Sequence, residues 1–150
     1  LFEAIRSIAA PETAAQKCRI HGDYRLGQAL LSEGDISIQN VEGHVAWPAA
    51  AQREKQSPLK DVASMLRSFS YVAHAAVLTR ATATPDQLRH FTGWALSWNA
   101  WASPIGDGRD ALLQFFMLDR SLRELEGELK NRTEWISIPL NGLVELLGLR

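Results

Sequence analysis

The segment that most constrains the fold is the polar run at residues 21–28, which reads HGDYRLGQ. Asp23 stands two positions after His21 and five before the amide of Gln28. A loop that turns back on itself brings a carboxylate and an amide with this spacing to one side of the chain. There the carboxylate can accept a proton from a hydroxyl, and the amide oxygen can hold a magnesium ion beside phosphate groups. The run therefore predicts Asp23 as a catalytic base and Gln28 as a ligand of Mg²⁺ and phosphate.

A second polar position follows twelve residues after Gln28, at Asn40. Two short strands, 29–31 and 35–40, around a turn at 33–35 would bring Asn40 next to the loop. In phosphotransferase loops of this kind the position usually carries a metal-binding Asp, whereas Mg²⁺ prefers hard, anionic oxygens. We expect a metal site of Gln28, Asn40 and Glu42, with ATP as co-substrate. Arg25 is a candidate contact for the phosphates, and a solvated surface side chain is the alternative.

The composition is that of one globular domain over residues 1–150. The hydrophobic fraction is 46% and the charged fraction 22%. A net charge of −1 argues against a general nucleic-acid binder. The sequence has neither an apolar run long enough for a membrane span nor a signal peptide, so we expect a cytoplasmic protein with no membrane partner. The single Cys18 cannot form an internal disulfide, and we expect it to be buried on a short strand at 17–20.

Helical periodicity dominates the rest of the chain. Pro58 opens a predicted helix over 59–79, whose apolar stripe consists of Val62, Met65, Leu66, Phe69 and Val72. On this helix we expect Asp61 to brace the loop and Arg67 to pair with a buried carboxylate. Further helices are predicted over 85–102, 112–131 and 139–147, and a loop over 46–57. A small β unit followed by three long helices is an α-dominated α+β fold.

Three separated stretches carry a resemblance to a known family. Residues 18–28 read CRIHGDYRLGQ, residues 57–71 read SPLKDVASMLRSFSY, and residues 128–140 read ELKNRTEWISIPL. In this order they resemble the maltokinases of the aminoglycoside-phosphotransferase-like kinase superfamily, which also occur fused to trehalose synthase. The sequence departs from the family pattern at Arg25, Asn40 and Val45, where maltokinases have His, Asp and Pro.

The resemblance implies the C-terminal lobe of a protein-kinase-like fold. The N-lobe with its nucleotide-binding lysine is absent, so we expect the chain to be a fragment. The implied activity is phosphorylation of maltose, or a related α-glucoside, by ATP and Mg²⁺ to give maltose 1-phosphate in α-glucan and trehalose metabolism. Asn40 and the missing N-lobe are expected to impair it. The alternative is a non-catalytic sugar-binding or regulatory module, docked on trehalose synthase or on a chain that bears an N-lobe.

The resemblance also implies a sugar site at the C-terminal end. Its residues would be Glu124, Glu128, Asn131 and Trp135, the first three spaced along one face of the last long helix. A solvated helix face is the alternative for these three positions. A tryptophan stripe lies further upstream, at Trp94, Trp98 and Trp101. Core packing is the favoured interpretation of this stripe, and a platform for sugar stacking is the alternative.

Overall fold

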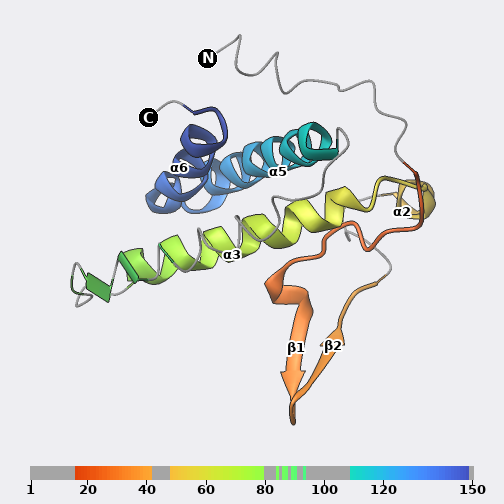
Figure 1. Cartoon of the computed structure of the whole chain (residues 1–150), viewed down its shortest axis with the longest axis horizontal. Coiled ribbons are helices and arrows are strands. Elements are labelled where there is room, and N and C mark those ends of the chain that lie inside the picture. The colour runs from red at the N-terminus through yellow and green to blue at the C-terminus, as the bar shows by residue number, and fades with distance from the viewer. Residues whose placement is uncertain are drawn as a thin grey trace.

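The fold is built around one long helix. The computed structural model describes residues 16–41, 48–79, 84, 86–87, 89–90, 93 and 109–148. In chain order the elements are η1 (Leu26–Gln28), β1 (Ala29–Ser32), β2 (Asp35–Ile38), α2 (Ala49–Arg53), α3 (Leu59–Thr79), α5 (Arg109–Asn131), η2 (Thr133–Trp135) and α6 (Ser137–Leu146). Helix α3 runs across the molecule, with α5 and α6 on one side and the β hairpin on the other (Figure 1). The predicted α-dominated α+β fold is confirmed.

The β hairpin has one apolar face. Its antiparallel register pairs Ala29 with Ile38 and Leu31 with Ile36, so these four side chains share a face. The turn residues Glu33 and Gly34 have φ values of 53° and 88°, the left-handed backbone that matches the twist of a tight hairpin. Leu31, Ile36 and Ile38 are 71%, 66% and 48% exposed. A two-stranded sheet is marginally stable alone, so this face is suited to packing against another element.

The core lies where α3 meets α5. Ala63 and Leu66 of α3 pack against Leu113 of α5 in a buried cluster, joined by the partly buried side chains of Val62, Phe116 and Met117. The predicted apolar stripe was wrong at its end, because Val72 is 48% exposed. The inner face of α3 here carries buried polar side chains instead, namely Arg67, Ser70 and, one turn earlier, Ser64. The buried face of α3 therefore mixes apolar and polar side chains along its length.

Several local predictions need correction. Cys18 is exposed rather than buried, because it forms only an isolated β bridge with Gln56 at the surface. The predicted loop over 46–57 contains the short helix α2, which the alanines at 49–51 favour. Most of the predicted helix over 85–102 lies outside the described residues, together with Trp94, Trp98, Trp101 and Glu42. Within the described part of the chain, no helix has the length and apolar character needed to span a membrane.

Helix α6 crosses α3 at a glycine, and this contact gives a first prediction. A Cβ added to Gly142 would stand 2.2 Å from Nη1 of Arg67, a buried and ion-paired group that cannot easily move. We expect Gly142→Ala to lower the free energy of unfolding by about 1–3 kcal/mol, as overpacking usually does. Urea unfolding monitored by circular dichroism measures this change.

The matched control is Gly127→Ala on α5, where an added Cβ meets nothing within 4 Å. Because alanine favours the helix, this control should gain about 0.5–1 kcal/mol. Equal unfolding midpoints for the two variants would contradict the close contact between α6 and Arg67.

Candidate active site

Side chains of helix α3 hold the polar loop, residues 21–28, through the backbone N–H groups of the loop. The carboxylate of Asp61 accepts hydrogen bonds from the backbone N–H of His21 at 2.7 Å and of Gly22 at 2.8 Å. Two turns further along α3, the hydroxyl of Ser68 accepts a third from the N–H of Leu26 at 3.1 Å. Hydrogen bonds to a charged acceptor are stronger than neutral ones. The prediction that Asp61 braces the loop is therefore confirmed.

The ring of His21 joins the loop to the segment that follows β2. Its Nε2 lies 2.7 Å from the carbonyl oxygen of Gln39, and the backbone N–H of Asp23 donates to its Nδ1 at 3.3 Å. A carbonyl oxygen can only accept, so Nε2 donates to Gln39. His21 thus has a structural role, which is to fix the position of the Asp23 backbone.

The carboxylate of Asp23 is 6% exposed and receives three side-chain donors. Oδ1 accepts from Nη1 of Arg120 at 3.1 Å, and Oδ2 accepts from Nε of Arg25 at 3.1 Å and from Nε2 of Gln28 at 3.2 Å. Burial raises the pKa of Asp23, but the donors, above all Arg25, outweigh burial and hold the pKa below its usual range. The loop therefore presents an ionised, oriented carboxylate.

The two amides predicted to bind metal lie next to each other. Nδ2 of Asn40 donates to Oε1 of Gln28 at 2.7 Å, while the amide nitrogen of Gln28 points to Asp23. Asn40 has a φ of 55°, a left-handed conformation that asparagine tolerates. Oxygen donors suit Mg²⁺, but both amides are neutral, so they fit only a weak site that phosphates and water would complete. Among the described residues, no group of three or more His, Cys, Asp or Glu side chains could hold a metal ion.

This geometry predicts that Asn40→Asp strengthens divalent-metal binding. The substitution adds a negative charge, and it removes the amide N–H₂ that now occupies Oε1 of Gln28. We expect the affinity for Mn²⁺ to rise by about tenfold or more. Calorimetric titration with Mn²⁺ measures the gain, and Asn131→Asp at the exposed end of α5 serves as the control. Equal affinities for the wild type and Asn40→Asp would mean that position 40 does not face the metal.

A cavity of about 390 Å³ opens beside Asp23 between the loop, α3 and α5. Its charged lining carries both signs and consists of Asp23, Arg25, Lys60, Asp119, Arg120, Arg123, Glu124 and Glu126. Phe116 contributes one aromatic side chain. The volume lies in the range of small-molecule sites, and such a dense polar lining fits a ligand rich in hydroxyl groups better than an apolar one.

The structure separates the four residues predicted to contact sugar into two groups. Glu124 lines the cavity beside Asp23 and forms ion pairs with Arg67 at 2.8 Å and Arg120 at 3.4 Å. The prediction that Arg67 pairs with a carboxylate is confirmed, and this carboxylate is partly rather than fully buried.

The other three lie around Arg132, outside the lining of that cavity. Glu128 accepts hydrogen bonds from Tyr71 at 2.6 Å and from Arg132 at 2.7 Å, while Arg132 lies over Trp135, which stacks on Tyr71. Burial and the Glu128 carboxylate raise the pKa of Tyr71. Asn131 donates to the carbonyl oxygen of Gly127 at 2.9 Å.

Comparison with known proteins decides the fold. No protein-family model matches the sequence. A glucosamine kinase of Streptacidiphilus jiangxiensis is 24% identical over 136 residues, which cover 85% of this chain and 31% of that protein. The structure of a glucosamine kinase in complex with glucosamine, ADP and inorganic phosphate superposes with a TM-score of 0.75 at 20% identity, over 99% of this chain and 45% of that one. A second crystal form gives a TM-score of 0.74 at 20% identity, over 97% and 41%. The chain has the C-lobe of a kinase-like fold.

The C-lobe expected from the sequence is thus confirmed, and the chain spans less than half the length of these relatives. Assignment to the maltokinases and fusion with trehalose synthase stay predictions. Sequence reasoning missed Arg120, the second guanidinium on Asp23. A signal for it was present, because Arg120 lies one helical turn before Glu124 on the face that also carries Glu128.

Proposed function

We propose that residues 1–150 form the C-lobe of an ATP-dependent sugar kinase in which Asp23 receives the proton of the acceptor hydroxyl. One observation carries the proposal: in a kinase-like C-lobe, a buried carboxylate held by three donors lies on the wall of a polar cavity. Similarity to glucosamine kinase supports phosphorylation of a sugar by ATP in general.

In this mechanism the sugar binds in the cavity with one hydroxyl against Asp23. The hydroxyl oxygen attacks the γ-phosphorus of ATP, its proton passes to the carboxylate, and the bond from that phosphorus to the ADP oxygen breaks. Oδ2 is the accessible proton acceptor, because Arg25 is exposed and can leave it for the incoming phosphate. Gln28 and Asn40 would hold Mg²⁺, which supplies charge neutralisation on the phosphates when bound. Catalysis is then mainly positioning and electrostatics.

Maltose, phosphorylated at its anomeric hydroxyl, is the acceptor that the sequence resemblance favours. Glucosamine is the competing acceptor, because a solved kinase with this fold holds glucosamine. The charges of the cavity favour neither an amino sugar nor a neutral one, because four acidic and four basic side chains line it. Maltose and glucosamine should therefore be compared as acceptors in the same assay.

A second candidate function is a sugar-binding or regulatory module without turnover. Two observations favour it: a neutral amide at position 40, and a guanidinium directly on the catalytic carboxylate. The exposed apolar face of the hairpin supports a partner in either case, and we propose a nucleotide-binding N-lobe, on this or another polypeptide, as the element that covers it. Trehalose synthase as partner and a cytoplasmic location remain predictions.

This account predicts that the 150-residue chain binds Mg²⁺–ATP weakly. The neutral amides offer little charge to the metal, and residues 1–150 span less than half the length of the kinases they match. We expect a dissociation constant above about 1 mM in calorimetry. Low-micromolar binding would contradict this prediction.

The decisive assay of the proposal is phosphate transfer from γ-labelled ATP at millimolar concentration to glucosamine, maltose and glucose. The kinase proposal predicts a labelled sugar phosphate from at least one sugar. Sugar binding without product would favour the module. Failure to bind any of these sugars would contradict both.

A further inference from the structure

An ion pair joins the helical interior to the wall of the cavity, where Glu124 lies. Arg67 of α3 is 2% exposed, and its Nη2 donates to Oε2 of Glu124 on α5 at 2.8 Å. Its Nη1 lies 3.4 Å from the hydroxyl of Ser70, and helix α6 closes over it at Gly142. Arg67 is therefore fixed from three helices and has little freedom to move.

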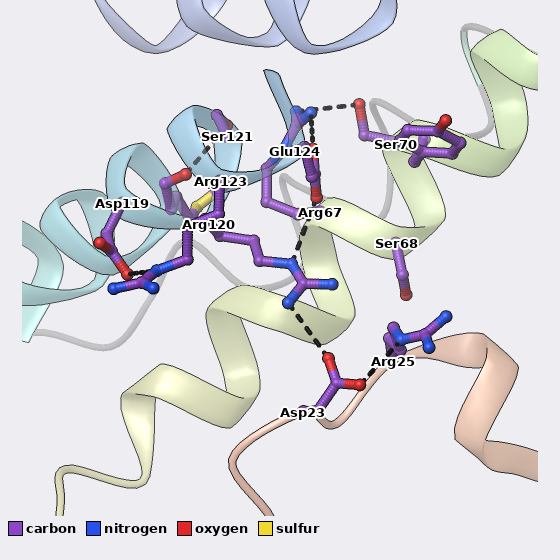
Figure 2. Close-up of polar contacts among 12 residues, drawn as sticks. Asp23, Arg25, Arg67, Ser68, Ser70, Asp119, Arg120, Ser121, Arg123 and Glu124 are labelled. Carbon is purple, nitrogen blue, oxygen red and sulfur yellow. Dashed lines mark hydrogen bonds and ion pairs between the residues drawn. The ribbon is translucent and has the colours of Figure 1, made fainter. Parts of the chain in front are cut away.

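Glu124 extends this ion pair towards the loop. Its second oxygen, Oε1, lies 3.4 Å from Nε of Arg120, one turn earlier on α5. Nη1 of Arg120 in turn donates to Oδ1 of Asp23 at 3.1 Å. The four side chains form a row of alternating charge from the helical interior to the loop (Figure 2).

We infer that Arg67 and Glu124 are positioning residues of the proposed phosphotransfer, which they serve by holding the guanidinium of Arg120 against Oδ1 of Asp23. The inference rests on the proposed function for its catalytic consequence. The two oxygens of Asp23 then differ: Oδ1 is tied to the helices through Arg120, whereas Oδ2 accepts from Gln28 of the loop and from Arg25, whose side chain is 44% exposed. A base oriented in this way presents a single oxygen to the acceptor.

Stability alone does not require these charges. A buried ion pair is often no more stable than two apolar side chains of similar volume, whereas removal of one partner leaves an uncompensated charge. A merely structural pair at positions 67 and 124 is therefore replaceable by apolar residues. A pair that positions Arg120 cannot be replaced in this way, because methionine and leucine carry no charge that attracts a guanidinium.

The test uses the double variant R67M/E124L of the full 150-residue chain. The apolar pair should keep the unfolding midpoint near that of the wild type. The Nε–Hε NMR signal of Arg120 should change from an ordered to a mobile side chain. The kcat for the sugar substrate should fall by about 10²-fold, the usual cost of a misplaced catalytic group.

A matched control removes the neighbouring ion pair of α5 through E128L/R132M, which should leave the Arg120 signal unchanged. If R67M/E124L does not fold, R67M/E124Q gives the comparison, since it removes both charges of the pair and keeps the side-chain shape at position 124. An Arg120 signal as ordered as in the wild type would overturn the inference, as would wild-type turnover in the variant. Absence of phosphate transfer by the wild type would count against the proposed function, and the NMR comparison alone would then decide the positioning claim.

Discussion

Replacing Asp23 with Asn should lower the rate of phosphate transfer to sugar by about 10²- to 10⁴-fold, the usual contribution of a general base. The amide keeps the shape of the carboxylate but cannot accept a proton. As a neutral group the amide also accepts weaker hydrogen bonds from the side chains of Arg120, Arg25 and Gln28. The two guanidinium groups would then face a side chain without charge. The loss should appear mainly in kcat, because the substitution keeps the shape of the cavity wall and removes the proton acceptor.

The measurement is the initial rate of sugar phosphate formation at saturating ATP, with the unfolding midpoint recorded for each variant. Asp35→Asn, at the exposed start of β2, provides a matched control that changes the same charge away from the cavity. A folded Asp23→Asn variant with the wild-type rate would exclude Asp23 as the base.

Replacing Asp61 with Asn should destabilise the fold by about 3 kcal/mol. Each oxygen of this carboxylate accepts one backbone N–H of the loop, from His21 at 2.7 Å and from Gly22 at 2.8 Å. Hydrogen bonds to a charged group contribute about 1.5–3 kcal/mol each, and asparagine would turn an N–H₂ towards one of the two donors. The loop should loosen, so the rate of phosphate transfer should fall as well.

Urea unfolding gives the change in stability. Asp119→Asn is the matched control, since Asp119 pairs with Arg123 on the surface of α5, where such pairs contribute at most about 1 kcal/mol. Equal losses for Asp61→Asn and Asp119→Asn would contradict the role of Asp61 in holding the loop.

The sequence predicted the loop and its support because both depend on local spacing. The five-residue interval from Asp23 to Gln28 and the hairpin after it bring Asn40 against Gln28, as the 2.7 Å hydrogen bond shows. The role of Asp61 was also predictable from local sequence. A carboxylate in the first turn of a well-defined helix lies where it can accept hydrogen bonds from backbone N–H groups.

Contacts between distant segments were harder to predict. Arg120 reaches Asp23 across 97 positions, and nothing in the local pattern says that α5 packs with this face towards the loop. The same packing places Glu124 at the cavity and turns Glu128 towards Tyr71 and Arg132, although both glutamates belong to one helical stripe. Cys18 was misjudged because small apolar residues are usually buried, whereas here the strand pairs only at one bridge.

The most direct test of the sugar site is an NMR titration of the 150-residue chain with glucosamine and with maltose. If the acceptor binds beside Asp23, the first signals to shift should be the backbone amides of Gly22 and Ser64 and the side chain of Arg120, which line the cavity. The indole N–H of Trp135 should stay unchanged, because Trp135 packs on Tyr71 and Arg132 away from that lining. Shifts that begin at Trp135 and leave the cavity signals in place would contradict the account.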